Sequence, residues 1–489
     1  MNLNQMFTDA PALYIENLMV DSRRKVKRGL FFCLKGMYHD GHQFVDMAIK
    51  NGAVAVVHSD PLASMSPTVT YIKVDDVLKT LNGVAHRFYG TPSSQMLVYG
   101  VTGTNGKSTT ATLLKYFNEA MMPTGYIGTI AIEYGSIKDL PLLTTPDVID
   151  LHATFAKMVK AGMKAVALEV SSHGLEQQRV ASVDFDVAIF TNLTHDHLDF
   201  HGNMENYYQA KKKLFTMLKP SALSIVNVDD KYGHRLSDEI DGQVIRVGTD
   251  SDCDYQASDI QLFPKKTVFN LHVKHTNETV RIVTNVVAMF NVSNLLGVIA
   301  AVHQKGLPLE TIVEMAKSIP QVDGRMEIID MNQGFNVIVD YAHTPDGLTQ
   351  IFKYATSITN PSKRIIAVFG SAGQRDTKKR PIFGELADKY CDMIILTEED
   401  PRTEKVRDIC NEIRSGIKST NAVIIEDRYD AIHQACSIAC TGDTVLILGK
   451  GDEPYMYREF GREDWMGDHE AAKEVLQSLQ EEQKENLYE

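Results

Sequence analysis

One stretch of the sequence has the residue order of a phosphate-binding loop: an apolar run, a glycine-rich turn and then a helical pattern. It comprises the apolar run Met96 to Val101, the loop residues Gly103, Thr104, Asn105, Gly106, Lys107, Ser108 and Thr109, and the helical segment Thr110 to Glu119. Glycines let several backbone N–H groups converge on one anion, and the N-terminus of the helix adds its positive end. In such loops the lysine bridges phosphates and a hydroxyl holds Mg²⁺. We therefore expect Lys107 to contact the phosphates of a nucleotide, and Ser108 or Thr109 to bind the metal.

The spacing of this loop leaves one alternative open. Its Gly-x-x-Gly-Lys-Ser pattern, Gly103 to Ser108, is shorter than the Gly-x-x-x-x-Gly-Lys-Ser of many P-loop ATPases. An ordinary glycine turn that opens a helix would also fit the bare pattern. The strand pattern before the loop and the Lys-Ser pair at its end favour the phosphate site.

Metal-ligating residue types follow two later strand patterns. Glu169 ends the apolar run Ala165 to Glu169, so its carboxylate would emerge at the carboxyl edge of a sheet, where doubly wound folds bind ligands. The segment Thr191 to His201 follows another strand pattern and holds three histidines and two aspartates. Burying such groups costs free energy unless they are solvated or bound. We interpret Glu169 as a Mg²⁺ ligand and the segment as a second source of ligands, with a polar surface loop as the alternative.

Three consecutive lysines, Lys211 to Lys213, lie in a helical pattern from Tyr208 to Phe215. Composition alone predicts that these lysines form the solvated face of the helix. The lysine run by itself therefore indicates no chemistry.

The elements that must hold these residues alternate between strands and helices. A chain of 489 residues suggests about three units of roughly 100 to 200 residues each. Apolar strand patterns separated by helical stretches predict parallel sheets covered on both faces. The expected strands are residues 29–34, 53–57, 96–101, 165–170, 187–190, 223–228, 337–339, 364–369, 393–396 and 444–448. We predict an α/β protein of three domains: a small N-terminal α/β domain (1–90), a central doubly wound P-loop-type ATPase domain (91–322), and a C-terminal Rossmann-like α/β domain (323–489) that ends in a polar tail from Gln480.

The composition is that of a soluble globular protein. Hydrophobic residues make up 44% and charged residues 23%, and the formal net charge of -13 argues against a protein that binds nucleic acid by neutralising phosphates. No run approaches the roughly 18 apolar residues of a membrane span, and the N-terminus lacks a secretion signal, so we expect no membrane span and a cytoplasmic location. The six cysteines form no CxxC pair. We expect buried free thiols, with three disulfides as the alternative.

Eight motifs in chain order resemble those of the Mur ligase family, across essentially the whole chain. They are Gly103 to Thr109, Glu169-Val-Ser-Ser-His-Gly174, Asn192 to Asp199, Tyr208 to Lys211, Phe290-Asn-Val-Ser-Asn294, Gly324-Arg-Met-Glu327, Asp340-Tyr-Ala-His-Thr-Pro-Asp346 and Lys379-Arg-Pro381. The resemblance implies an ATP-dependent amide ligase of peptidoglycan synthesis, and within the family the member that adds the third amino acid. Ala288 departs from the family pattern, which has glycine before Phe-Asn.

Residue by residue, the resemblance implies a nucleotide site with two magnesium ions. Lys107 would contact the phosphates, and Ser108, Glu169 and His197 would be magnesium ligands. Lys211 matches a lysine that CO2 carbamylates in this family, which turns a cation into an anionic oxygen ligand for the second magnesium. The residues that match those around the adenine, phosphates and ribose are Asn294, Arg325, Asp340 and His343.

The resemblance also implies a pocket for a UDP-N-acetylmuramoyl dipeptide. Asp21-Ser-Arg-Arg24 and Asp40-Gly-His-Gln43 resemble the part that holds uridine diphosphate, with Ser22 as the best single candidate. The residues that resemble the muramoyl-dipeptide site are Thr144, Thr145, Ser171, Gln177 and Arg179. Outside the family, such short motifs would be turn signals.

The expected amino-acid pocket departs most from the family pattern. The family's Asp-Asn-Pro-Arg motif, whose arginine grips the distal carboxylate of meso-diaminopimelate, reads Glu399-Asp-Pro-Arg402 here, and its Gly-Lys-Gly-His-Glu motif reads Gly449-Lys-Gly-Asp-Glu453. The candidate residues are Arg375, Glu399, Asp400, Pro401, Arg402, Gly449 and Glu453. A guanidinium suits a carboxylate through paired hydrogen bonds, and L-lysine offers no distal carboxylate. We favour meso-diaminopimelate, with L-lysine as the alternative because two additional acids suit a more cationic substrate.

The implied reaction activates the D-glutamate side-chain carboxylate of UDP-N-acetylmuramoyl-L-alanyl-D-glutamate with ATP, and the amine then attacks the acyl phosphate. Such a reaction needs positioned reactants and offset charge, with Lys107, Arg325 and the metals acting on the phosphoryl group and no covalent nucleophile. We expect a monomer whose C-terminal domain closes on substrate binding. Two alternatives stay open: a ligase like folylpolyglutamate synthase, which lacks the uridine pocket, and a catalytically inactive nucleotide-binding partner protein.

Overall fold

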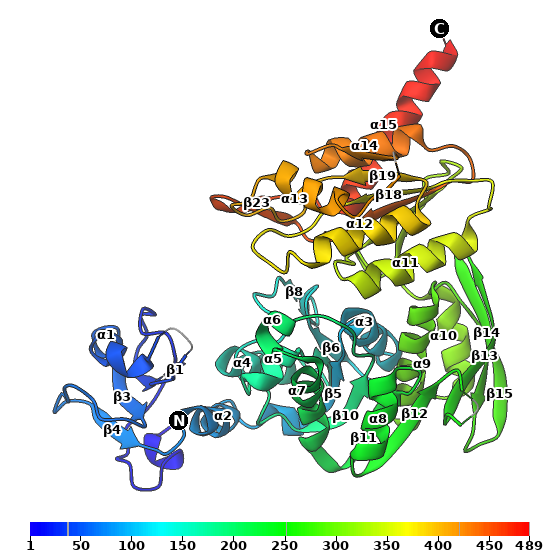
Figure 1. The fold of residues 1–489 in the computed structure, drawn as a ribbon. Helices are drawn as coiled ribbons and strands as arrows, with labels where there is room; N and C mark the ends of the chain where they lie inside the picture. Colours follow the sequence, from blue (N-terminus) through cyan, green and yellow to red (C-terminus); the bar gives the residue numbers. More distant parts are fainter. Residues whose placement is uncertain (37–38, 251, 420, 489) are drawn as a thin grey trace. The chain divides into compact units, whose positions relative to one another are not determined.

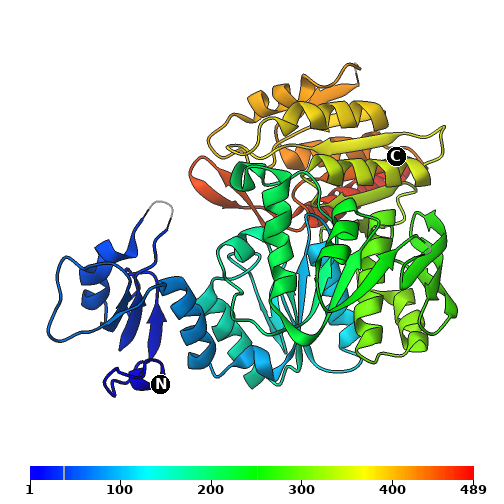
Figure 2. The same cartoon turned by 60° about the horizontal axis from the view of Figure 1, so that its bottom comes forward.

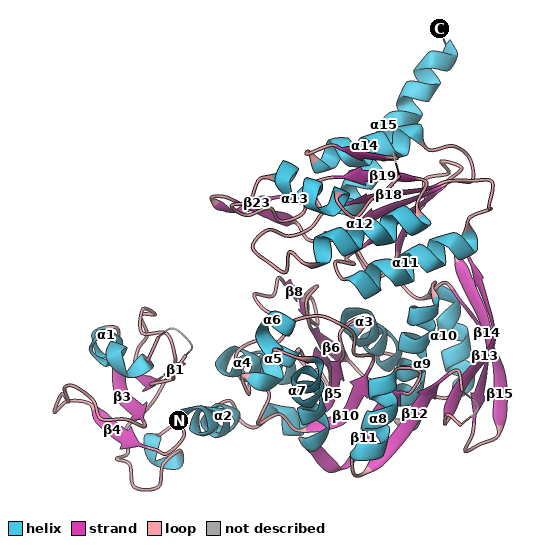
Figure 3. Cartoon of the chain, viewed as in Figure 1, coloured by secondary structure: helices cyan, strands magenta, loops and turns pink. Residues whose placement is uncertain are grey.

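The computed structural model describes residues 1–36, 39–250, 252–419 and 421–488. Helices and strands alternate along the chain (Figures 1 and 3), which confirms the predicted α/β class. Contacts between residues divide the chain into two units. The first unit comprises Met1–Thr102, Met121–Ala188 and Gln209–Ser224, and the second comprises Gly103–Ala120, Ile189–Tyr208 and Ile225–Glu489. The domain boundaries near residues 90 and 322 stay predictions.

The N-terminal part of the first unit is a four-stranded parallel sheet in the order β1-β2-β3-β4. Its elements are β1 (Asn17–Met19), β2 (Gly29–Phe32), α1 (Val45–Lys50), β3 (Ala53–His58), β4 (Thr70–Lys73) and α2 (Val77–Phe88). Successive strand residues point to opposite faces of a sheet. Phe32 therefore packs in the core that includes Leu81 of α2, whereas Phe31 packs in the core that includes Ala48 of α1. The two strands predicted in this region are confirmed.

The central sheet has eleven strands in the order β15-β14-β13-β12-β11-β10-β5-β9-β6-β7-β8. In the first unit, β5 and β6 both pair with β9 in parallel, and β7 and β8 add an antiparallel edge. The elements of this region are β5 (Leu97–Thr102), β6 (Thr124–Ile127), β7 (Ile132–Tyr134), β8 (Ile137–Asp139), α4 (Val148–Lys160), β9 (Ala165–Glu169) and α5 (Ser172–Glu176). The next elements are β10 (Phe185–Phe190), α6 (Leu198–His201), α7 (Met204–Thr216), β11 (Leu218–Asn227), α8 (Lys231–Glu239) and β12 (Gln243–Gly248). The parallel strands predicted at residues 96–101 and 165–170 are confirmed.

The second unit adds an antiparallel meander that the sequence analysis did not predict. Its strands are β13 (Tyr255–Phe263), β14 (Lys266–Val273) and β15 (Glu278–Thr284). Helices α9 (Met289–Gln304) and α10 (Leu309–Met315) contact β13 and β15, and Figures 1 and 2 show them beside the meander. Tyr255 and Ala257 are buried and alternate with less buried residues. This period of two is the signal that would have predicted the strand.

The C-terminal sheet has six strands in the order β16-β17-β21-β18-β19-β20, all parallel except the edge strand β16. Its elements are β16 (Glu327–Ile329), β17 (Asn336–Asp340), α11 (Pro345–Ile358), β18 (Ile365–Phe369), α12 (Lys379–Tyr390), β19 (Met393–Leu396), α13 (Val406–Arg414), β20 (Ala422–Ile424), α14 (Arg428–Ile438) and β21 (Thr444–Leu448). Ile338 packs with Leu348 of α11 on one face, and Val337 packs with Ala431 of α14 on the other. Helices thus cover both faces, as predicted for a doubly wound domain.

The C-terminal segment is helical, which no sequence pattern predicted. Helix α15 (Asp468–Tyr488) continues through the residues that the sequence analysis treats as a polar tail. Its first turns carry Val475 and Leu476 into the core beside β17 and β21, so the helix is anchored before it reaches the polar residues. Tertiary packing of one apolar end is enough to start a helix whose sequence is otherwise polar.

Two further expectations concern the cysteine thiols and the absence of membrane spans. All six cysteines are free, as expected, and Cys33, Cys253, Cys410 and Cys436 are buried. Cys440 is exposed, which corrects the expectation of burial for that residue because it lies in the turn before β21. Within the described residues, no helix combines the length and the apolar character that crossing a membrane requires.

Candidate active site

The phosphate loop begins directly after β5 and leads into α3 (Lys107–Asn118) in the second unit. Gly106 precedes the helix with φ 84, and a Cβ there would come within 2.4 Å of Asn294 Oδ1. A Cβ on Gly103 would come within 1.8 Å of Thr191 Oγ1. The helix begins at Lys107, three residues before the predicted start at Thr110, because Gly106 ends the turn in the left-handed conformation. Lys107, Ser108 and Thr109 therefore form the first helical turn, at the positive end of the helix.

A second loop, after β10, braces the phosphate loop. The Thr104 N–H donates to Asn192 O at 2.9 Å, and the Asn105 N–H donates to Asn192 Oδ1 at 3.0 Å. Thr191 Oγ1 donates to Asn105 O at 2.6 Å. The structure thus brings together two motifs that lie almost ninety residues apart, and it fixes the backbone of the phosphate loop on one side.

The ammonium group of Lys107 bends over its own loop. Its Nζ donates to Gly103 O at 3.1 Å and to Thr104 O at 2.9 Å. Asn294, the residue predicted to lie near the nucleotide, is buried in α9 against Gly106, and its Nδ2 donates to Asn291 Oδ1 at 3.0 Å. Lys107 and Asn294 therefore both lie against the backbone of the phosphate loop.

His197 and Asp196 lie in the bracing loop, just before α6. His197 has φ 52, and its Nε2 is 3.4 Å from Asp196 Oδ2. Burial raises the pKa of Asp196, but the charges of His197, His343 and Lys379 outweigh burial and lower the pKa below its usual range. The sequence motifs indicate His197 but not Asp196 as a ligand. The position of Asp196 between His195 and His197 was the available signal.

Glu169 is fully buried at the end of β9 in the first unit. In the sheet register it pairs with Val101, two residues before Gly103. Its Oε1 accepts hydrogen bonds from Tyr126 Oη at 2.6 Å and from the Thr129 N–H at 2.9 Å. These two donors, which no sequence motif indicated, orient the carboxylate.

Lys211 contradicts the prediction of a solvated helix face. It is 1% exposed in α7, on the same side as the buried Tyr207 and Leu214, which lie one turn away on either side. Lys213 agrees with the prediction, because its side chain is 43% exposed and pairs with Glu176 at 2.8 Å. Composition could not separate two lysines whose burial depends on the packing of the helix.

The predicted dipeptide-site residues form a connected network in the first unit. Thr145 Oγ1 donates to Glu169 O at 2.8 Å and accepts from the Ser171 N–H at 3.0 Å. Arg179 donates to Thr145 O at 2.8 Å and also to Gln177 Oε1. Thr144 Oγ1 lies 3.0 Å from Thr129 Oγ1.

Ser22, the candidate for the uridine pocket, lies apart from this network in the N-terminal sheet region. It is buried, and its Oγ contacts Met47 Sδ at 3.4 Å. Nearby, His42 Nδ1 lies 2.6 Å from Asp40 Oδ1, and its Nε2 accepts the Ser59 N–H at 3.1 Å. Both ring nitrogens are thus occupied by neighbouring residues of the N-terminal sheet region.

Asp340 and Arg325 lie together at the carboxyl end of β17. Asp340 accepts the Met326 N–H at 2.7 Å and the Ala342 N–H at 2.8 Å, so it holds the segment that carries Arg325. Burial raises the pKa of Asp340 against the opposing charge of Arg325. The Arg325 guanidinium lies 4.1 Å from the centre of the Tyr341 ring, and His343 Nδ1 lies 2.9 Å from Tyr341 O.

The expected amino-acid residues meet at the carboxyl ends of β19 and β21. Asp400 Oδ1 accepts from Lys450 Nζ at 2.9 Å, and Lys450 also pairs with Glu453. Burial alone would lower the pKa of Lys450. The carboxylates of Glu453 and Asp400 raise this pKa by more than burial lowers it, so the lysine stays charged. Glu453 Oε1 also accepts from Tyr341 Oη at 2.9 Å.

Other members of this group differ in burial. Glu399 is buried, and burial raises the pKa of its carboxyl against the charges of Lys379, His343 and Arg428. Gly449 has φ 112, and a Cβ there would come within 2.7 Å of Glu399 Oε2. Pro401 is buried, Arg402 is half-buried and Arg375 is exposed.

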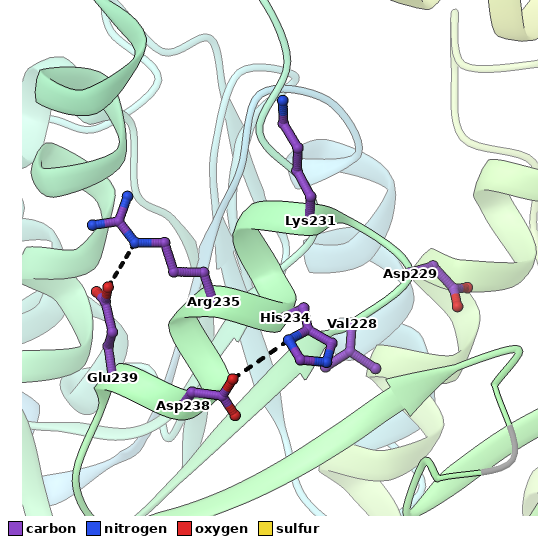
Figure 4. Close-up of a pocket in the computed structure, with 7 residues that line it drawn as sticks. All are labelled: Val228, Asp229, Lys231, His234, Arg235, Asp238 and Glu239. Atoms are coloured by element: carbon purple, nitrogen blue, oxygen red, sulfur yellow. Dashed lines mark hydrogen bonds and ion pairs between the residues drawn. The ribbon is translucent and has the colours of Figure 1, made fainter.

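A separate pocket of about 640 Å³ lies along α8 in the second unit (Figure 4). It is lined by Val228, Asp229, Lys231, His234, Arg235, Asp238 and Glu239. Arg235 pairs with Glu239 at 2.6 Å, and His234 Nδ1 lies 3.4 Å from Asp238 Oδ2. No residue of the predicted site lines it.

Known proteins and family models match this chain over most of its length. The Mur ligase family catalytic domain matches residues 14–89, the Mur ligase middle domain matches 101–302, and the Mur ligase glutamate ligase domain matches 324–451. A protein of Clostridium acetobutylicum named UDP-N-acetylmuramoyl-L-alanyl-D-glutamate--2,6-diaminopimelate ligase 1 is 39% identical over 444 residues, which cover 90% of each chain. The chain belongs to the Mur ligase family.

Further relatives agree with this assignment. A Mur ligase of Clostridioides difficile, with the same name but no number, is 40% identical over 475 residues, which cover 95% of this chain and 96% of its own length. A solved structure of a UDP-N-acetylmuramoyl-L-alanyl-D-glutamate--2,6-diaminopimelate ligase has a TM-score of 0.71 at 27% identity, covering 98% of this chain and 99% of the other.

Ala288, which stands where the Mur ligase family pattern has glycine, has a backbone conformation that favours glycine. Its φ of 75 and ψ of 145 lie in a region that glycine populates and alanine avoids. The residue is fully buried and opens α9, the helix that carries Asn294. The packing around it therefore holds a strained backbone, at a cost on the order of 1 to 3 kcal/mol.

Proposed function

We propose that this chain uses ATP to join meso-diaminopimelate to the D-glutamate side chain of UDP-N-acetylmuramoyl-L-alanyl-D-glutamate. The names of the Clostridium and Clostridioides relatives state this type of reaction for those proteins. The observation that carries the choice of amine is the pairing of Asp400 with Lys450. Because Lys450 pairs with Asp400, one of the two additional acids, Asp400 adds little attraction for a second ammonium group, and Arg402 remains to receive a carboxylate.

ATP fits the loop from Gly103 to Thr109. Gly106 leaves open the space that a Cβ would fill, and the first turn of α3 presents backbone N–H groups to an anion. Lys107, whose Nζ now contacts two loop carbonyls, would turn to the β- and γ-phosphates. Asn294, Arg325, Asp340 and His343 would complete the nucleotide site.

The chain's own residues have mainly a positioning role in the reaction. The D-glutamate carboxylate takes the γ-phosphoryl group of ATP and ADP leaves; the amine then attacks the acyl phosphate and displaces phosphate through a tetrahedral intermediate, forming the amide. Thr145, Ser171 and Arg179 would hold the muramoyl dipeptide, and Ser22 its uridine diphosphate. Arg325 and Lys107 would offset the negative charge that develops on the phosphoryl oxygens.

Magnesium would be held by Ser108, Glu169, His197 and Lys211 as a carbamate. The fit rests on Glu169, a buried carboxylate oriented by Tyr126 and Thr129, because Mg²⁺ prefers oxygen ligands. Bound Mg²⁺ would neutralise charge on the transferring phosphoryl group. Lys211 is 1% exposed, so a carbamate there would be shielded from bulk water and acid, which decompose carbamates.

A phosphate-release assay tests the proposed function. We expect release only when ATP, Mg²⁺, UDP-N-acetylmuramoyl-L-alanyl-D-glutamate and meso-diaminopimelate are all present, and loss of release in Lys107→Ala. Release with folate and glutamate instead would favour the folylpolyglutamate-synthase-like alternative. No release with any amine would favour a catalytically inactive nucleotide-binding protein.

We also propose that the chain acts as a monomer in the cytoplasm and closes its C-terminal domain on substrates. Light scattering on the purified chain measures the first point. Small-angle scattering with and without ATP and the muramoyl dipeptide measures the second, and an unchanged radius of gyration would contradict closure.

A further inference from the structure

A small hairpin lies beside the amino-acid residues of the second unit. Strands β22 (Tyr455–Arg458) and β23 (Gly461–Asp464) form it directly after Glu453. The main chain of Tyr457 binds the amino-acid loop on both sides: its N–H donates to Asp400 Oδ1 at 3.0 Å, and its carbonyl accepts the Arg402 N–H at 2.8 Å. The hairpin therefore fixes the two residues that flank Pro401.

The aromatic side chains of the hairpin extend this contact. The Arg402 guanidinium lies 5.7 Å from the centre of the Tyr457 ring, within the range of a cation–π interaction. Tyr457 in turn packs edge-on against Tyr455 at 5.4 Å. Arg462 lies 3.8 Å and Lys450 Nζ 5.1 Å from the Tyr455 ring centre. Two tyrosine rings are thus held between cations, with Arg402 at one end.

The contact with the Tyr457 ring determines which groups of Arg402 can bind a substrate. A ring face attracts a guanidinium without using its N–H donors. In the part of the chain that the structure describes, the Arg402 guanidinium lies near the Tyr457 ring and makes no hydrogen bond or ion pair. Arg402 also has φ 54, a backbone conformation that a non-glycine residue keeps only when its surroundings hold it. The hairpin orients the side chain while its donors remain open to a planar carboxylate.

We infer that Tyr457 is a positioning residue that selects for an amine with a distal carboxylate. It holds Arg402 in the conformation that receives this carboxylate, whereas an amine that ends in an ammonium group gains nothing from the arrangement. The inference rests on the proposed function and names a determinant of its substrate class. No sequence motif indicated Tyr457, because the contact depends on the folding of the hairpin against a loop more than fifty residues earlier.

Two substitutions of Tyr457 test the contributions of its aromatic ring and its hydroxyl group separately. Tyr457→Leu keeps an apolar, branched side chain but removes the aromatic face, and Tyr457→Phe removes only the hydroxyl. All variants keep the main-chain bonds to Asp400 and Arg402. Phe460→Ala is the matched control, because Phe460 lies in the same hairpin and is 93% exposed.

The measurement is kcat and KM for meso-diaminopimelate in the phosphate-release assay, with KM for ATP and the thermal midpoint alongside. We expect Tyr457→Leu to raise KM for meso-diaminopimelate about tenfold, as the loss of one cation–π contact implies. KM for ATP and the thermal midpoint should stay at the wild-type values, and Tyr457→Phe and Phe460→Ala should match the wild type.

The outcomes distinguish the inference from the proposed function. If the wild type is active with meso-diaminopimelate and Tyr457→Leu leaves its KM unchanged, the inference alone is overturned. If Tyr457→Phe loses as much as Tyr457→Leu, the ring face is not the determinant and the inference is likewise overturned. A wild type that fails to release phosphate with every amine that carries a distal carboxylate overturns both.

Discussion

Asn294 of α9 lies directly against Gly106 of the phosphate loop, with its Oδ1 2.4 Å from the position that a Cβ on Gly106 would take. Asn294 is itself held by a hydrogen bond of 3.0 Å to Asn291. Gly106 also has φ 84. Space and backbone conformation therefore both require glycine at this position, and α9 forms one wall of the loop.

Replacement of Gly106 should separate these two requirements. We expect Gly106→Ala to lower phosphate release about 100-fold, because a displacement of the loop by a fraction of an ångström misplaces the phosphates. Gly162→Ala is the matched control, since Gly162 has the same φ of 84 and nothing within 4 Å of its Cβ. Both variants should lose about 1 kcal/mol of stability from backbone strain. Equal activity of the two variants would show that the contact with Asn294 is unimportant.

Lys211 and Lys213 offer a second matched pair. Lys211 is 1% exposed and the Lys213 side chain is 43% exposed in the same helix. If Lys211 carries a carbamate that binds magnesium, Lys211→Ala should lose about 100-fold or more of the activity, and Lys213→Ala should keep it. Carbon NMR with isotopically labelled bicarbonate should show a carbamate signal in the wild type and in Lys213→Ala. A signal that persists in Lys211→Ala would assign the modification elsewhere.

The strands that position the site could be predicted because their apolar runs are continuous. Strands such as β5, β9 and β21 are buried on both faces, so nearly all of their residues are apolar and the run is easy to recognise in the sequence. The meander β13 to β15 has only an alternating pattern and was missed. The phosphate loop was predicted because Lys107 and its glycines are adjacent in sequence.

Contacts between distant segments could not be predicted. Nothing local to Tyr126 or Thr129 indicates that they orient Glu169, and nothing near Tyr457 indicates that it contacts Arg402. The burial of Lys211 has the same cause, because the direction of a helix face is set by the elements that pack on it. Sequence patterns identify the reacting groups more readily than the residues that orient them.

A buried histidine, His152, and its half-buried neighbour His86 should make the first unit sensitive to acid. His152 of α4 packs edge-on against His86 of α2, with ring centres 5.4 Å apart. Burial, assisted by the charge of His86, lowers the pKa of His152 from 6.5 to about 3, and burial lowers the pKa of His86 as well. Between pH 6.5 and about pH 3, His152 is protonated in the unfolded chain but not in the folded chain. The free energy of unfolding that is present above pH 6.5 is therefore lost progressively as the pH falls.

Calorimetry from about pH 7 to about pH 5 measures this loss. We expect the free energy of unfolding to fall by about 1.4 kcal/mol per pH unit for His152 once the pH is below its unfolded pKa. His152→Gln should show a shallower dependence, and His234→Gln, whose wild-type side chain is 64% exposed, should follow the wild type. Parallel curves for all three proteins would contradict the assignment.

Ala288 should be a site where glycine is better than the natural residue. Ala288→Gly removes a Cβ from a backbone with φ 75, so we expect a gain of about 1 kcal/mol in stability and a higher thermal midpoint. Ala300→Gly, in the regular interior of α9, is the control and should lose about 1 kcal/mol. A lower midpoint for Ala288→Gly would mean that the methyl group contributes more by packing than it costs in strain.

The most direct test of the account is a competition between amines. The chain is incubated with ATP, Mg²⁺, UDP-N-acetylmuramoyl-L-alanyl-D-glutamate and equal concentrations of meso-diaminopimelate and L-lysine, and mass spectrometry identifies the tripeptide product. We expect the diaminopimelate product to dominate with the wild type and to lose its advantage with Arg402→Ala. A product that contains mainly lysine, unchanged by Arg402→Ala, would contradict the central claim that Arg402 receives the distal carboxylate of the substrate.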